Sequence, residues 1–369
     1  MTHNLEASLR FYDKVALGRD LQGDITDLAN WDADPDFVRG RSVYRVLENR
    51  LNNPQKSLPG IVAVQVKNVG DFRDPKNPGL PGDGDYAQIE SAPLIFPVVN
   101  ENLTLTPKCA FPIPRGGEVE KDNWREFEDM VLEFEAGSNV IVPLGAGTYN
   151  GRKWNGQPLG VLAVGLYHRR DPRFYDFFKY NLDNVRHGDK SDLTRLMTDY
   201  ARELVGNSPT VQGWSECARK GFYEWGVTLS RLRKILHVNP NSANAYFDGS
   251  EVFMHDFGRV LRRSELSPEQ AYLTQVIRVA APAIASIQSI LCKDFGNIIC
   301  MAEGKKEIGF NAFKEFLNGY FEDVAGKIRE QIDSVSEILQ GNTRINVELI
   351  LQCRPQDTIW RVIKTNHTA

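Results

Sequence analysis

The middle of the sequence contains two apolar runs, Asn139-Val140-Ile141-Val142-Pro143-Leu144 and Leu159-Gly160-Val161-Leu162-Ala163-Val164-Gly165-Leu166-Tyr167, separated by a segment rich in glycine and asparagine. Apolar and β-branched runs around such a segment are typical of a β-hairpin. Both runs are apolar at consecutive positions, which indicates strands that are covered on both faces. We therefore expect a central hairpin in a sheet that is packed on both sides.

Further elements are expected before this hairpin. The β-branched run from Gly60 to Lys67 predicts a strand, whereas the apolar spacing over residues 36–52 predicts a helix that ends at Asn53 and Pro54. Residues 68–92 show no periodicity and predict a long acidic loop without the spacing of an EF-hand. Residues 122–136 predict a second helix. Its expected buried stripe consists of Trp124, Phe127, Met130, Val131 and Phe134.

The second half of the chain is expected to be mostly helical, with a β-hairpin at its end. Apolar residues recur at helical spacing over residues 191–205, 211–237, 250–263, 268–300 and 310–339. After these segments, residues 344–352 and 358–364 alternate between apolar and polar side chains, which predicts two paired strands. Whether this terminal hairpin joins the first sheet stays open.

These patterns predict an α+β fold in four parts. We expect an N-terminal extension over residues 1–35, an α+β domain over 36–186, a helical domain over 187–341 and a terminal β-hairpin over 342–369. At 369 residues, the chain is long enough for two domains of about 150 residues.

The composition excludes several classes of protein. The chain is 41% hydrophobic and 25% charged, which is typical of folded proteins and excludes a wholly disordered or collagen-like chain. Its net charge of -4 argues against a nucleic-acid partner, because such proteins are usually basic. The five cysteines are scattered and never spaced as CxxC, which favours reduced thiols over disulfides or a zinc site.

The sequence also predicts a cytoplasmic protein without a membrane partner. The longest apolar stretch, around Val279 to Ala285, is shorter than the roughly 18 residues that a spanning helix needs. The first residues lack the basic start and the apolar core of a secretory signal.

The adjacent residues His255 and Asp256 suggest one metal site. They lie in an apolar segment that resembles the helix carrying the His-Asp doublet of HD-family phosphohydrolases. In that family a further histidine and aspartate help to bind a divalent metal that activates water, and His237 and Asp294 could fill these places. The alternative is a doublet on a helix surface, with Asp256 solvated.

Two other motifs have simpler structural explanations. The glycines at positions 145, 147 and 151 lead into a strand, whereas a phosphate-binding loop leads into a helix. The run from His187 to Asp192 contains residues that end one helix and cap the next. No GxSxG motif identifies a nucleophile.

Residues 36–185 resemble a GAF domain, a sensory fold that binds small molecules. The resemblance rests on the strand ending in Pro143-Leu144 and on the following strand with Gly160-Val161-Leu162. The helix over residues 122–136 and the strand from Gly60 to Lys67 also fit it. It implies a central antiparallel sheet flanked by helices, with a pocket over one face shaped by residues 68–115. GAF domains commonly dimerise through flanking helices and pass a signal to an output module.

The resemblance implies a regulatory or sensory protein that binds a small molecule or a partner protein. The long apolar stripe of residues 310–339 must be buried in a bundle or between subunits, so we expect a homo-oligomer. Two alternatives stay open: a metal-dependent phosphohydrolase that uses His237, His255, Asp256 and Asp294, and an assembly subunit without a catalytic site. The sequence identifies neither a ligand nor a cofactor.

Overall fold

The chain forms two compact units in the computed structural model. Unit 1 comprises Met1–Ile95, Cys109–Asp171 and Asp256–Arg259, and unit 2 comprises Phe96–Lys108, Pro172–His255 and Val260–Ala369. The structure describes residues 6–39, 42–55, 57–69, 84–85, 94–99, 105–110, 118–154, 156–169, 211–237, 244–258, 260–267, 270–271, 315 and 319.

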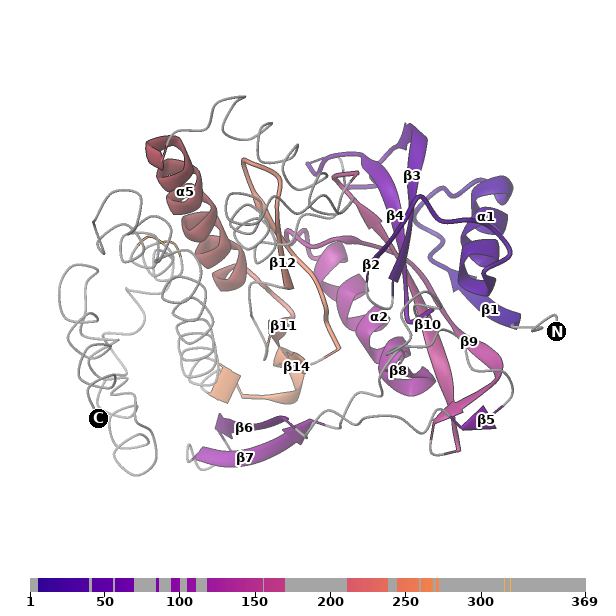
Figure 1. The fold of residues 1–369 in the computed structure, drawn as a ribbon. Helices are drawn as coiled ribbons and strands as arrows, with labels where there is room; N and C mark the ends of the chain where they lie inside the picture. Colours follow the sequence, from indigo (N-terminus) through magenta and orange to yellow (C-terminus); the bar gives the residue numbers. More distant parts are fainter. Residues whose placement is uncertain are drawn as a thin grey trace. The chain divides into compact units, whose positions relative to one another are not determined.

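Unit 1 is built around one sheet with the strand order β1-β9-β10-β4-β3-β2, in which every neighbouring pair is antiparallel (Figure 1). These strands are β1 (Glu6–Phe11), β9 (Val142–Trp154), β10 (Gln157–Leu166), β4 (Ile61–Lys67), β3 (Ser42–Leu51) and β2 (Phe37–Arg39). Two short strands extend it: β5 (Gly84–Asp85) pairs with β9, and β8 (Glu118–Val119) pairs with β10. Together with the helices, this sheet confirms the expected α+β class.

The predicted central hairpin is confirmed as β9 and β10. The two strands pair along most of their length, with β1 on one side and β4 on the other, and they are buried over Val142–Gly147 and Leu159–Leu166. Both strands extend into the segment expected as a loop, and the turn between them contains Gly156 at a φ of 75°. Glycine adopts this left-handed conformation without the steric cost that a side chain would add.

Two helices pack on this sheet, on opposite sides of it in Figure 1. They are α1 (Arg19–Asn30) and α2 (Glu120–Glu135), of which the second confirms the helix predicted over residues 122–136. From β9, the Tyr149 hydroxyl donates a hydrogen bond to the carbonyl of Ala29 in α1. On the other side, the ring of Tyr12 makes edge contacts with Phe127 and Phe134 of α2.

The helix predicted over residues 36–52 is wrong, because this segment forms β2 and β3. Val43, Tyr44 and Val46 fit a helical spacing, but they are also β-branched or aromatic and therefore suit a strand. The apolar spacing fits both the 3.6-residue period of a helix and a strand, and the antiparallel pairing of β3 with β4 stabilises the strand. Pairing partners distant in sequence are not visible in a local pattern.

The first residues also differ from the expected extension. Strand β1 pairs with β9 from Glu6 to Phe11, and α1 packs against β1 and β4. Part of the segment expected to precede the domain therefore forms one edge of its sheet.

Unit 2 contains α5 (Val211–Ser230), which confirms the first part of the helix predicted over residues 211–237. Its short strands are β11 (Ile235–His237), β12 (Ala245–Phe247), β13 (Val252–Met254) and β14 (Val260–Arg262), followed by the 3-10 helix η2 (Arg263–Glu265). β11 pairs with β14, and β12 pairs with β13. A further two-stranded sheet consists of β6 (Leu94–Val99) and β7 (Leu105–Ala110), and each of these strands has residues in both units.

The helix predicted over residues 250–263 is wrong, because the segment forms β13 and β14. Gly249 at a φ of 99° and Asp256 at a φ of 60° interrupt any helix, since both backbones are left-handed. From α5, the Thr228 hydroxyl donates a hydrogen bond to the carbonyl of Val252, which ties β13 to the helix.

Several predictions fall outside the described residues. They are the helix over residues 191–205, nearly all of those over 268–300 and 310–339, and the terminal hairpin. The proposed domain limits at residues 186 and 341 therefore stay predictions. Among the helices in the described part of the chain, none has the length and apolarity to cross a membrane.

Candidate functional site

Four polar side chains lie on one face of strands β3 and β4. Ser42 lies opposite Lys67, and Tyr44 lies opposite Gln65, in the antiparallel register. Because alternate residues of a strand point to the same side, all four share that face. Their relative exposures are 6%, 6%, 1% and 2%, so they form a buried polar patch on a sheet that is otherwise largely apolar. The name polar patch refers to these four side chains.

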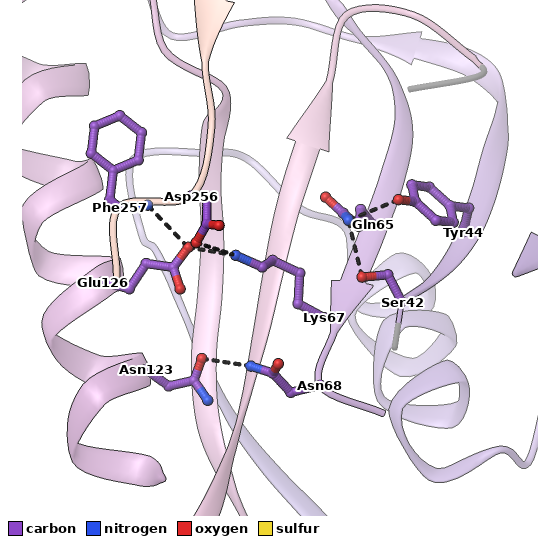
Figure 2. A network of polar contacts seen from close by, with 9 residues as sticks. All are labelled: Ser42, Tyr44, Gln65, Lys67, Asn68, Asn123, Glu126, Asp256 and Phe257. Atoms are coloured by element: carbon purple, nitrogen blue, oxygen red, sulfur yellow. Dashed lines mark hydrogen bonds and ion pairs between the residues drawn. The ribbon is translucent and has the colours of Figure 1, made fainter. Parts of the chain in front are cut away.

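The Gln65 amide is the centre of the polar patch. Its Nε2 donates to Ser42 Oγ at 3.1 Å and to Tyr44 Oη at 2.8 Å (Figure 2). In the part of the chain that the structure describes, the Oε1 atom of the same amide is buried and accepts no hydrogen bond. Exchanging the two amide ends would instead leave the NH₂ group at that position, so one end lacks a partner in either orientation.

A buried ion pair joins the polar patch to helix α2. Lys67 Nζ lies 2.5 Å from Glu126 Oε1, and both side chains are buried. The same carboxylate oxygen accepts the backbone N–H of Phe257 at 3.2 Å. Asp256 Oδ1 lies 3.6 Å from Lys67 Nζ and is the more exposed end of the arrangement (Figure 2). Lys67, Glu126, Asp256 and Phe257 form the Glu126 cluster.

A second amide pair lies beside this cluster. Asn68 Nδ2 donates to Asn123 Oδ1 at 2.8 Å, and both residues are fully buried. Gly160 of β10 makes room for Asn123, because a Cβ atom at Gly160 would overlap its side chain. Asn68 Oδ1 is a further buried oxygen without a hydrogen bond among the described residues.

The predicted buried stripe of α2 is only partly right. Met130 and Phe134 are buried as expected, but Trp124, Phe127 and Val131 are only half-buried. The rest of the buried face is polar and consists of Asn123, Glu126, Asp129 and Glu133. These residues also recur at helical spacing. A second, polar stripe beside the apolar one was therefore the sequence feature that could have predicted this buried polar face.

The ionisable groups of this polar stripe are all carboxylates. Glu126 is paired with Lys67, Arg125 lies 3.7 Å from Asp129, and Ser138 donates a hydrogen bond to Glu133. The buried carboxylates of α2 therefore each have a cation or a hydrogen-bond donor beside them.

A second polar cluster at the other end of α2 is more exposed. Tyr12 donates to Glu135 Oε1 at 2.7 Å, and Lys14 Nζ lies 2.5 Å from the same oxygen. The hydrogen bond from Lys14, followed by that from Tyr12, lowers the pKa of Glu135. Burial, followed by the nearby Glu135, raises the pKa of Tyr12 above its usual value. Solvent screens this ion pair, so it contributes little to the stability of the fold.

The residues of the predicted metal site are placed as follows. His237 ends β11 opposite Val260, and His255 follows β13, fully buried, with its backbone N–H bonded to the carbonyl of Asn244. Asp256 faces Lys67, not a helix surface. Asp294 lies outside the described residues, so the four-residue site stays a prediction. Where the chain is described, no three His, Cys, Asp or Glu side chains gather as metal ligands would.

Comparisons with known proteins do not identify the chain. No protein-family model matches it, and no curated protein matches it either. A solved structure of glucosamine kinase is 13% identical, with a TM-score of 0.30, and the match covers 100% of this chain and 92% of the kinase chain. A glucosamine kinase in complex with glucosamine, ADP and inorganic phosphate is 13% identical, with a TM-score of 0.28, and the match covers 92% of this chain and 93% of that kinase chain. Similarities this weak carry no argument about fold or function.

Proposed function

We propose that unit 1 is the ligand-binding module of a regulatory or sensory protein and that the polar patch binds the ligand. The observation that carries this proposal is the Gln65 amide, which Ser42 and Tyr44 hold at one end only. Leaving a buried carbonyl without a partner costs about 1–3 kcal/mol. Native proteins rarely accept that cost without a compensating partner. A ligand that donates a hydrogen bond to Gln65 Oε1 would supply it.

The GAF-like nature of the module is part of this proposal. Three features support it: an antiparallel sheet, a central hairpin formed by β9 and β10, and helices packed on the sheet. A ligand over one face of such a sheet would favour one conformation of the protein over another by its difference in affinity for the two. This shift would be the regulatory signal.

The chemistry of the site limits the class of ligand. The oxygens of Gln65 and Asn68 offer acceptors, and the Glu126 carboxylate beside them is already paired with Lys67. We expect a neutral small molecule with N–H or O–H groups, because such groups can donate to these oxygens, whereas a cation would be repelled by the Lys67 ammonium group of the polar patch.

Native mass spectrometry of the full chain, incubated with a small-molecule extract of the expression host, tests the proposal. We expect a small-molecule adduct on the wild type that is lost in Gln65→Leu, which removes both ends of the amide. Tyr167→Phe is the matched control, because it removes a buried hydrogen bond to Val140 away from the polar patch. The control should keep the adduct.

A second variant covers the case in which Gln65→Leu does not fold. Tyr44→Phe removes one hydroxyl contact to Gln65 but keeps the ring that stacks on Phe37 at 4.3 Å. It should weaken the adduct while leaving the sheet intact. No adduct on the wild type, or an adduct of equal occupancy in the folded variants, would overturn the proposal. A stable oligomer without any adduct would favour the assembly subunit.

A further inference from the structure

We infer that Lys67 and Glu126 form a releasable latch that holds the segment Asp256–Arg259 to unit 1. This goes beyond ligand binding, since the latch is a property of the protein alone. The chain leaves unit 2 after His255 and returns to it at Val260, so that only these four residues join unit 1.

Lys67 and Glu126 bind the first two residues of the segment, Asp256 and Phe257. Glu126 Oε1 accepts both Lys67 Nζ at 2.5 Å and the Phe257 N–H at 3.2 Å. Lys67 also attracts Asp256, whose carboxylate oxygen is 3.6 Å away. One charged oxygen and one ammonium group therefore hold two successive residues. Hydrogen bonds to charged groups are stronger than neutral ones, so the strength of the attachment depends on these charges.

The backbone of the segment gives a reason for release. Asp256 has a φ of 60°, a left-handed conformation that aspartate adopts more readily than most residues but that still costs more than the right-handed one. Such conformations persist where surrounding contacts impose them. Removing the Lys67 and Glu126 charges that anchor Asp256 and Phe257 would let the backbone relax, and this favours the released state.

The latch shares Lys67 with the polar patch. A ligand hydroxyl that donates to Gln65 and accepts a hydrogen bond from Lys67 Nζ would draw Lys67 away from Asp256 and weaken the latch, and this consequence rests on the proposed function. In the sequence, β13 precedes the segment and β14 follows it. The latch itself can be tested without any ligand.

Hydrogen–deuterium exchange of the ligand-free full chain tests the latch. Glu126→Gln keeps an oxygen for the Phe257 N–H but loses the charge that binds Lys67. We expect the Phe257 amide to exchange about tenfold faster, which corresponds to the loss of one charge-assisted contact. Amides in the centre of β10 should keep their wild-type rates.

Two further variants make the result decisive. Lys67→Met combined with Glu126→Gln removes both charges together and avoids a buried, unpaired one; it should accelerate the same amide. Lys14→Met removes the exposed ion pair with Glu135 and should change nothing at Phe257.

Unchanged Phe257 exchange in both Glu126 variants would overturn the latch, as would an equal acceleration throughout β10. Either result would leave the ligand adduct, and so the proposed function, to be decided separately.

Discussion

At the scale of single residues, the stability of unit 1 depends on Lys67. Its ammonium group lies within ion-pair distance of the buried Glu126. We expect Lys67→Met to lower the free energy of unfolding by about 3–5 kcal/mol, because it removes the counter-charge of a buried carboxylate. Urea unfolding of the full chain measures this loss.

The matched control for Lys67→Met is Lys14→Met. It breaks a Lys–Glu pair of the same 2.5 Å length whose side chains are exposed, and exposed pairs contribute about 0–1 kcal/mol. Replacing both partners, as in Lys67→Met with Glu126→Leu, should recover much of the stability. A cost for Lys67→Met no larger than that for Lys14→Met would contradict the dependence on Lys67.

Asp256 leads to a prediction about metals. Its carboxylate faces the Lys67 ammonium, and a cation in that place would be repelled. We therefore expect no stoichiometric Mn, Fe, Zn or Ni when the purified wild-type chain is analysed for metals. About one ion per chain, lost in Asp256→Asn, would instead favour the phosphohydrolase alternative.

Glu135 gives a prediction about pH. Its pKa is lowered by the hydrogen bonds from Lys14 and Tyr12, so the folded protein holds its proton less tightly than the unfolded chain does. The stabilisation is present above the unfolded pKa of about 4.5 and disappears as the pH falls through the folded pKa. NMR titration should show the pKa of Glu135 moving upward in Lys14→Met; an unchanged value would show that Lys14 does not lower it.

At the scale of elements, two glycines should respond oppositely to alanine. Gly23 lies inside α1 with open space around it, so Gly23→Ala should stabilise the protein by about 0.5–1 kcal/mol. At Gly147 a Cβ atom would meet the Ser8 carbonyl of the paired strand β1. Gly147→Ala should therefore cost about 1–3 kcal/mol. Thermal unfolding measures both, and effects of the same sign would contradict the described packing.

Elements with a clear period could be predicted from the sequence, and elements that depend on distant partners could not. A local pattern of apolar residues predicts each of several elements without reference to a distant partner. These elements are the hairpin of β9 and β10, strand β4 and helices α2 and α5. Strands β1 and β3 do not, since their partners are β9 and β4. The segment from β13 to β14 was mistaken for a helix because a β-branched apolar run fits both periods.

The candidate site was harder to predict than the fold. Gln65 and Lys67 lie in the run that correctly predicted β4, as polar residues two positions apart on one face. Whether Gln65 and Lys67 form a site depends on the register of β4 with Ser42 and Tyr44 and on the contact with Glu126. No local sequence pattern contains either of these. The chemistry of the His255–Asp256 doublet predicts a metal site, but the structure pairs Asp256 with Lys67.

At the scale of the whole molecule, unit 1 is assembled from three separate stretches of the chain. The third stretch, Asp256–Arg259, is far in sequence from the others, and Lys67 and Glu126 contact it. The expected homo-oligomer, the helical domain and the cytoplasmic location stay predictions.

Ligand binding at the polar patch can be decided by the electron density beside Gln65 in crystals of the full chain grown after incubation with the host extract. We predict density larger than a water molecule within hydrogen-bond distance of Gln65 Oε1. We also predict that this density is absent from crystals of Gln65→Leu. A lone ordered water at that position, or no density at all, would show that the polar patch is a structural feature and that its ligand does not exist.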